Sequence, residues 1–302
     1  MKTALRRIVA AIIAILSISL LAAPRAEAKK TLRILAVGNS FSDDAMEYLP
    51  ALLESMGIDD VELARLYVAG CSLEQHLRFH VGGESRYEFY RSAAGENRWV
   101  KSKERVSLRD ALSLGEWDII TLQQASGYSG RYESYLPYLD ALTGIIRAAQ
   151  PRAKLAWHMT WSYSTDSTHG QFADYGRDRR RMYDAICSAV RELARHTPAF
   201  STIIPSGTAI ESLRMSEINN PPKDLTRDGY HMDYGAGRYA LACVWYETLI
   251  RPFARKSMRD DTLRIEKGYV HVDDRVAALC RKAARKAARK NFTPRRIERR
   301  GE

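Results

Sequence analysis

A serine near the start of the chain and a histidine near its end, with a carboxylate three residues before it, have the types and spacing that acyl transfer requires. Ser40 closes the segment Gly-Asn-Ser, and Asp228 and His231 form a polar Asp-x-x-His segment. A carboxylate can hold an imidazole through one nitrogen while the other nitrogen accepts the proton of an attacking serine hydroxyl. Each segment alone is also common, as a plain turn or a hydrogen-bonded surface loop. Together they predict Ser40 as nucleophile, His231 as base and Asp228 as its orienting carboxylate.

The residues around Ser40 predict a strand, a tight turn and a helix. Apart from Arg33, residues 32–37 are apolar, and an amphipathic stretch then continues to about residue 56, with Asp43 or Asp44 available to cap it. A serine at such a turn presents its hydroxyl at the edge of a sheet, and the helix amides behind it favour developing negative charge.

The rest of the chain alternates between strand and helix patterns. Further apolar runs predict strands at residues 61–68, 117–122, 154–159 and 201–204. Longer amphipathic stretches predict helices at residues 132–149 and 172–195. This alternation predicts a three-layer α/β/α fold, with a mostly parallel sheet covered on both faces and a ligand site at the carboxyl ends of its strands. Residues of about 85–105 predict an inserted hairpin rather than a core element.

The order of these segments resembles that of the SGNH (GDSL-like) hydrolases. Residues 38–40 (Gly-Asn-Ser) are similar to the family's first block, Gly-Asp-Ser, which holds the nucleophile. Residues 228–231 (Asp-Gly-Tyr-His) are similar to its last block, Asp-x-x-His. The resemblance covers residues 32–249. It implies a flavodoxin-like sheet of five parallel strands and a serine esterase, deacetylase or lipase that needs no cofactor.

The resemblance also implies an oxyanion hole built from the amides of Ser40 and Gly70 and from a third block. That block usually carries an asparagine, whereas this chain carries Gln123 and Gln124, and so is similar to a divergent branch of the family. A glutamine amide can donate the same hydrogen bond. Because neighbouring strand residues face opposite ways, we expect one glutamine to reach the oxyanion, and favour Gln124. Gly70 is equally explained as a simple turn glycine.

Residues near the predicted strand ends are candidates for substrate contact: Asn39, His158, Trp161 and Tyr163. Asn39 replaces the aspartate that is usual in the family's first block. The aromatic faces suit sugar rings, and core packing is the alternative.

His158 and His169, with Asp166, offer an alternative metal site, but their spacing fits no metal motif. We therefore predict neither a metal nor a cofactor. The cysteines are too widely spaced for a metal or redox motif, and either buried thiols or disulfides are open to them: Cys71, Cys187, Cys243 and Cys280.

The N-terminal residues have the three-part pattern of a secretory signal. Basic residues precede an apolar stretch at 8–23, and Ala-Glu-Ala ending at Ala28 provides a small-residue cleavage site. We predict a signal peptide over residues 1–28 and an exported protein, periplasmic or extracellular, whose hydrolase domain spans residues 29–280. An uncleaved membrane anchor is the alternative, but the stretch is short for a bilayer span.

The net charge of +11 is concentrated at the two ends of the chain. Residues 281–302 hold ten Lys and Arg against two Glu, so the hydrolase domain is close to neutral. A neutral body removes the main compositional support for a nucleic-acid groove, and we predict no nucleic-acid partner. The basic C-terminal tail, residues 281–302, is predicted to be a solvated, frayed end; contact with an anionic polymer or membrane surface is the alternative.

These features predict an exported serine esterase that hydrolyses carboxylic esters. The expected partner is an acylated glycan or another small ester, with O-acetyl groups on carbohydrate as the preferred substrate. A non-catalytic carbohydrate-binding or surface-interaction protein on a decayed scaffold is the rival hypothesis, because the third block is incomplete. A metal hydrolase is the third.

Overall fold

The computed structural model describes residues 30–298. The predicted signal peptide lies outside these residues. Residues 31–298 belong to one compact unit. In this part of the chain, no helix has both the length and the apolar character that crossing a membrane requires.

The centre of the unit is a sheet that, within the described residues, has seven strands in the order β4-β3-β2-β1-β5-β6-β7. Its five parallel strands are the predicted ones: β1 (Leu32–Gly38), β2 (Val61–Tyr67), β5 (Ile119–Leu122), β6 (Lys154–His158) and β7 (Thr202–Ile204). β1 and β5 are apolar and buried because helices cover both faces of the sheet. The predicted α/β/α fold is confirmed.

The inserted hairpin forms β3 (Tyr87–Ser92) and β4 (Val100–Val106), which pair antiparallel and extend the sheet beyond β2. The expectation that it lies outside the core is wrong, since Tyr87 and Phe89 are buried. Aromatic side chains at alternate positions of β3 pack inward, as a strand with one covered face requires.

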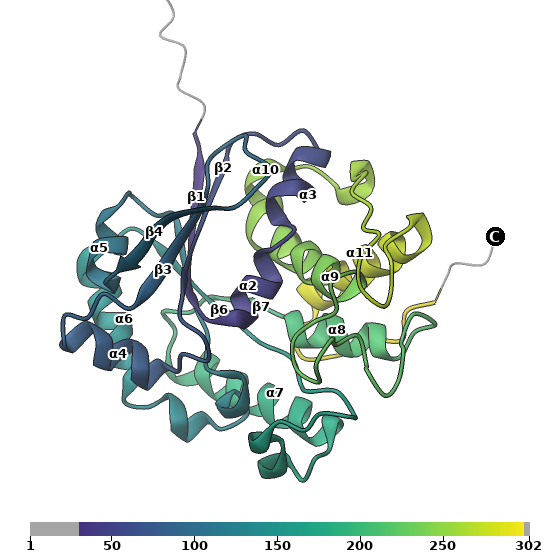
Figure 1. The fold of residues 1–302 in the computed structure, drawn as a ribbon. Coiled ribbons are helices and arrows are strands. Elements are labelled where there is room, and N and C mark those ends of the chain that lie inside the picture. The colour runs from purple at the N-terminus through teal and green to yellow at the C-terminus, as the bar shows by residue number, and fades with distance from the viewer. Residues whose placement is uncertain (1–29, 299–302) are drawn as a thin grey trace, which may run out of the picture. The chain divides into compact units, whose positions relative to one another are not determined.

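Helices form a layer on each side of the sheet (Figure 1). One layer contains α4 (Leu73–Val81), α5 (Leu108–Ser113) and α6 (Tyr138–Ala149). The other contains α2 (Ser40–Met46), α3 (Leu49–Ser55), α8 (Ser206–Arg214), α9 (Ala236–Trp245) and α11 (Asp274–Arg289). The remaining helices are α7 (Arg179–His196) and α10 (Arg251–Ala254), the latter joined to α9 by a π-helical turn at Tyr246–Ile250.

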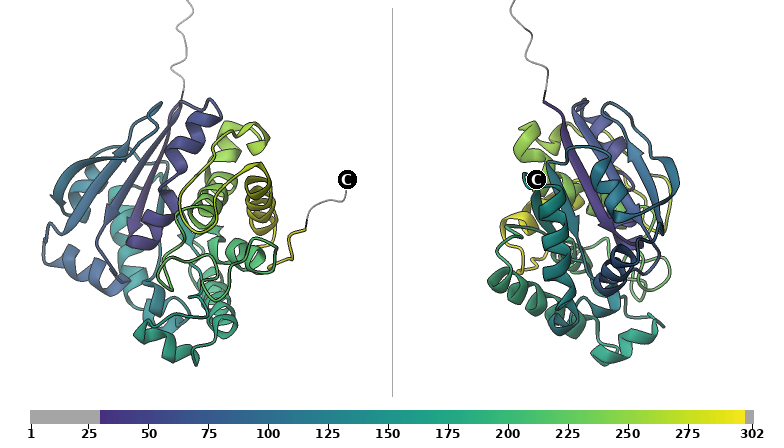
Figure 2. Two further views of the ribbon diagram at one scale, coloured as in Figure 1. Left: turned by 45° about the vertical axis from the view of Figure 1, so that its right-hand side comes forward. Right: turned by 90° about the vertical axis from the view of Figure 1, so that its left-hand side faces the viewer.

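The C-terminal basic segment differs from its prediction. Residues 281–289 are the second half of α11, which lies beside α9 in the views of Figures 1 and 2. Ala283, Ala284 and Ala287 are buried, and small side chains of this kind allow α11 to approach its neighbours α9 and α8 closely. The expectation of a frayed end is therefore wrong for these residues, and a domain boundary at residue 281 falls inside a helix.

Candidate active site

Ser40 is the first residue of α2, directly after β1. Asn39 is the N-cap, and its Oδ1 accepts a hydrogen bond from the Phe41 amide at 3.0 Å. Neither Asp43 nor Asp44 caps this helix, because α2 begins at Ser40, four or five residues earlier than such a cap requires. The Ser40 amide belongs to the first turn, where helix amides have no partner within the helix. The turn therefore places a hydroxyl and an available N–H together at the carboxyl end of β1.

The segment that carries the histidine is folded by its own aspartate. Asp228 Oδ1 accepts hydrogen bonds from the amides of Tyr230 (3.2 Å) and His231 (2.8 Å). Gly229 between them has φ +97°, a conformation that favours glycine. A Cβ at this position would also lie 3.0 Å from the Cα of Ser167. One oxygen of Asp228 thus shapes the loop and leaves the other for the imidazole.

The three predicted triad residues meet in the structure. His231 Nδ1 lies 2.7 Å from Asp228 Oδ2, and His231 Nε2 lies 2.8 Å from Ser40 Oγ. Burial alone would raise the pKa of the Asp228 carboxyl. Hydrogen bonds from the side chain and backbone of His231 outweigh this effect and lower the pKa to about 2. The charged carboxylate fixes the proton of the imidazole on Nδ1. Nε2 is then free to accept the proton of the Ser40 hydroxyl.

The predicted oxyanion donors do not all face this site. Gln124 Nε2 donates to the Ser134 carbonyl at 2.9 Å, and Gln124 Oε1 accepts from the Leu73 amide at 3.1 Å. Gln124 therefore links the segment around Ser134 to the start of α4 at Leu73. Its prediction as an oxyanion donor is wrong. Gln123 Nε2 donates to Asn39 Oδ1 at 2.8 Å, which directs it at the helix cap instead.

Gly70 lies at the predicted position, in the turn after β2. It is exposed and has φ +63°, and no atom lies within 4 Å of the place a Cβ would occupy. No hydrogen bond of its amide to another described residue is present. The open turn leaves this N–H able to join that of Ser40.

The predicted substrate-contact residues are buried and lie beneath the site. The exposed fractions of Asn39, His158, Trp161 and Tyr163 are at most 1%. Trp161 stacks on Phe41 with ring centroids 4.2 Å apart, and its Nε1 donates to the Tyr230 carbonyl at 2.7 Å. Their prediction as substrate contacts is wrong, because all four side chains are buried within the protein. The half-buried rings nearest the imidazole are instead Tyr230 (4.4 Å from His231 between centroids) and His169 (5.0 Å from Tyr230).

A group of charged residues that sequence reasoning missed joins α2 to the loop that carries His231. We call this loop, residues 226–232, the histidine loop. Asp44, only 1% exposed, accepts hydrogen bonds from the guanidinium groups of Arg227 (3.0 Å) and Arg238 (2.9 Å). It also accepts the Met232 amide at 2.9 Å. The sequence signal was Arg227 directly before the aspartate of the Asp-x-x-His segment. We call Asp44, Arg227 and Arg238 the Asp44 cluster.

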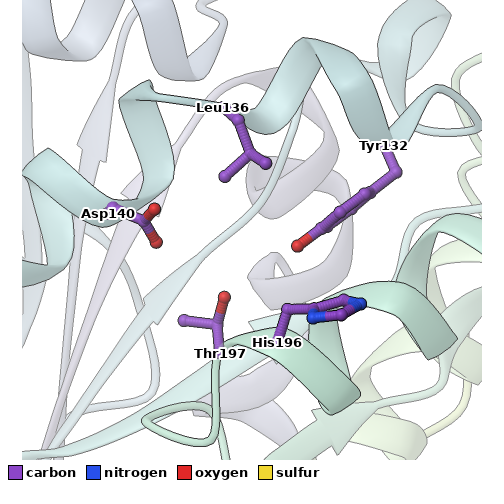
Figure 3. Close-up of a pocket in the computed structure, with 5 residues that line it drawn as sticks. All are labelled: Tyr132, Leu136, Asp140, His196 and Thr197. Carbon is purple, nitrogen blue, oxygen red and sulfur yellow. The ribbon is translucent and has the colours of Figure 1, made fainter.

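A surface pocket of about 300 Å³ lies apart from the triad. It is lined by Tyr132, Leu136, Asp140, His196 and Thr197, and Figure 3 shows the hydroxyls of Tyr132 and Thr197 pointing into it. None of the triad residues borders it. Elsewhere among residues 30–298, no three His, Cys, Asp or Glu side chains gather as metal ligands, and the four cysteines are buried and unpaired.

Comparison with known proteins places this geometry in context. A family model described as "Domain of unknown function (DUF4886)" matches residues 33–287. A crystal structure of a DUF4886 family protein from Bacteroides uniformis is 34% identical, with a TM-score of 0.77, over 87% of this chain and 97% of that one. A protein from Slackia heliotrinireducens, described as a candidate SGNH hydrolase, is 20% identical, with a TM-score of 0.51, over 73% and 100%. No curated protein matches the sequence.

Proposed function

The chain belongs to the DUF4886 family, and we propose that it is a serine ester hydrolase of the SGNH type. The single observation that carries the proposal is the continuous contact from Asp228 through His231 to Ser40, at 2.7 and 2.8 Å. Both distances lie within the range that general-base activation of a serine needs. The fold likeness to the Slackia protein is consistent with this reading.

The reaction is a two-step acyl transfer. Ser40 Oγ bonds to the ester carbonyl carbon while its proton moves to His231 Nε2, and the carbonyl electrons move onto oxygen. When the tetrahedral intermediate collapses, the bond to the alcohol breaks and the alcohol takes the proton from His231. Water then adds to the acyl-Ser40 ester with His231 again as base, and the carboxylic acid leaves as Ser40 regains its proton.

The amides of Ser40 and Gly70 are the proposed oxyanion donors. The Ser40 amide heads α2, and the Gly70 amide stands in an open turn at the neighbouring strand end, since β1 and β2 are paired along their length. Fixed N–H groups of this kind stabilise the developing negative charge without rearranging.

We propose small acyl groups on carbohydrate as the substrate class. The support is the rim of the site, where the half-buried ring of Tyr230 lies beside the imidazole and His169 packs against it. A flat aromatic face next to a nucleophile suits a sugar ring. Release of acetate should therefore be faster from acetylated oligosaccharides than from alkyl acetates, and p-nitrophenyl ester turnover should fall as the acyl chain lengthens. Equal turnover of acetyl and long-chain esters would reject this substrate class.

The activity is tested with p-nitrophenyl acetate and a fluorophosphonate probe. Ser40→Ala and His231→Ala should each abolish turnover above background, and the probe should be mapped to Ser40 by mass spectrometry. Ser113→Ala and His196→Ala, on exposed parts of α5 and α7, are the matched controls and should retain wild-type turnover. Undiminished turnover in Ser40→Ala or His231→Ala, or labelling elsewhere, would reject the assignment; a folded protein without turnover would favour the carbohydrate-binding alternative.

We also propose that residues 1–28 direct export. The mature protein, recovered from the periplasm or the medium, should begin at Lys29 by N-terminal mass spectrometry. Recovery of the intact N-terminus in the membrane fraction would favour the uncleaved anchor.

A further inference from the structure

A row of buried polar side chains crosses the carboxyl edge of the sheet beneath Ser40. Ser206 Oγ lies 3.0 Å from His158 Nε2, and His158 Nδ1 lies 2.7 Å from Gln123 Oε1. Gln123 Nε2 lies 2.8 Å from Asn39 Oδ1, and Asn39 Nδ2 lies 3.0 Å from the Cys71 carbonyl. All five residues are at most 1% exposed. The row follows the ends of β7, β6, β5, β1 and β2 in their order across the sheet.

The direction of every hydrogen bond in this row follows from its backbone contacts. Asn39 Oδ1 accepts from the Phe41 amide, and the Cys71 carbonyl can only accept, so the Asn39 amide has one possible orientation. Gln123 must then donate to Asn39 through Nε2 and accept through Oε1. His158 must in turn donate from Nδ1 and accept the Ser206 proton at Nε2. Burial lowers the pKa of His158 to about 3, which keeps the ring neutral with a single N–H.

We infer that this hydrogen-bond chain fixes the positions of the two oxyanion amides, those of Ser40 and Gly70, relative to each other. The chain runs in one direction, from Ser206 through His158, Gln123 and Asn39 to the Cys71 carbonyl. The inference rests on the proposed function. Asn39 precedes Ser40, and Cys71 follows Gly70, so the last hydrogen bond clamps the two turns together. Packing does not do this at Gly70, which has no neighbour at the Cβ position. Aligned hydrogen bonds in a buried row also polarise and strengthen one another.

The hydrogen-bond chain accounts for both departures from the SGNH pattern, the asparagine in the first block and the glutamine in the third. The Cys71 carbonyl needs a donor at position 39, where an aspartate would set a carboxylate oxygen against a carbonyl oxygen. Asn39 Oδ1 needs a second donor, which Gln123 supplies and which His158 orients. Asn39, Gln123 and His158 are thus positioning residues, and the third-block glutamine acts through the cap instead of on the oxyanion.

The first test restores the usual aspartate. Asn39→Asp and Gln123→Glu should each lower kcat on p-nitrophenyl acetate by about 10- to 100-fold with little change in KM, because misplaced oxyanion donors weaken transition-state binding. Gln150→Glu is the control: this half-buried glutamine donates to the carbonyls of Leu112 and Gly115, away from the turns of Ser40 and Gly70, and should keep kcat within about threefold. Folding of each variant is checked by circular dichroism. Loss of kcat in the control equal to that in the two variants would overturn the inference.

The second test needs no activity. In ¹⁵N-labelled wild-type protein, the His158 ring should show a protonated Nδ1 and an unprotonated Nε2 by long-range ¹H–¹⁵N correlation, unchanged from pH 5 to pH 8. A protonated Nε2, or titration in that range, would overturn the direction of the chain. If the wild type hydrolyses no ester, the proposed function fails while this tautomer measurement still decides whether the chain exists.

Discussion

Asp44→Asn removes one negative charge from the centre of the Asp44 cluster with almost no change in shape. The carboxylate is buried and is shared by Arg227, Arg238 and the Met232 amide, at distances of 2.7 to 3.2 Å. An asparagine keeps one acceptor oxygen and turns an N–H₂ group towards at least one of these donors. Two guanidinium groups then lose their counter-charge.

The magnitude follows from the burial of the partners. Breaking a fully buried ion pair costs about 3–5 kcal/mol. The side chains of Arg227 and Arg238 retain 18% and 16% exposure, so water can partly replace the lost partner. We expect a loss of about 2–3 kcal/mol, which for a domain of this size lowers Tm by roughly 4–10 °C. The histidine loop also loosens against α2, and kcat/KM should fall by about tenfold.

The assay pairs calorimetric Tm with ester turnover at pH 7.5. Asp43→Asn is the control: Asp43 is the preceding residue, lies 3.4 Å from Arg65, and forms no hydrogen bond or ion pair with the histidine loop. It should change kcat/KM by less than about twofold. If Asp44→Asn is as stable and as active as Asp43→Asn, the reasoning about the cluster is refuted.

Three further outcomes are expected. Burial raises the pKa of Asp43 to about 6, so the folded state binds its proton more tightly than the unfolded state does. The free energy of unfolding of the wild type, relative to that of Asp43→Asn, should therefore fall by about 2 kcal/mol as pH rises from 4 to 6. Urea titrations measure it, and a difference between the two proteins that does not change with pH would contradict the prediction. Asp228→Asn should lower kcat by about 10³- to 10⁴-fold, because asparagine stabilises the wrong tautomer of His231. Single-turnover experiments measure this loss. A loss below about tenfold would show that the carboxylate only shapes the loop. Gly229→Ala, with φ +97° and a close backbone neighbour, should cost more than Gly83→Ala, with φ +64° and open space; for Gly83 we expect about 1 kcal/mol, and equal costs by thermal unfolding would refute the steric argument.

The fold could be predicted because five apolar runs alternate with amphipathic stretches, and parallel strands gather their carboxyl ends at one edge. The same rule placed Ser40 and Gly70 at that edge, whereas the meeting of Ser40 with His231 was predicted from the two segments together, because His231 lies in the loop before α9 and not at a strand end. The burial of the hairpin was not predicted. The sequence of a strand with one covered face, such as β3, resembles that of a solvated strand, and the difference comes from the residues that pack on the covered face. The alanines of α11 were the available signal of a packed face, but helix propensity explained them equally well.

The details of the site depended on what the sequence does not encode locally. Alternation predicted that one of the two glutamines reaches the oxyanion, yet β5 ends at Leu122, so both glutamines lie beyond the strand where alternation no longer applies. Trp161 and Tyr163 were candidates for substrate contact because they follow a strand end, and the alternative, core packing, is what the structure shows. Their burial comes from loops that lie far away in the chain, including the histidine loop itself.

The antiparallel hairpin has a consequence for how the molecule behaves among its own copies. A parallel sheet ending at β2 would offer a seven-residue edge with unpaired backbone groups, to which another chain could add. β4 ends the sheet instead with an exposed strand rich in charge, including Lys101, Lys103 and Glu104, while the opposite edge, β7, is only three residues long. Like charges on two such edges repel, which disfavours edge-to-edge pairing of copies into continuous sheets.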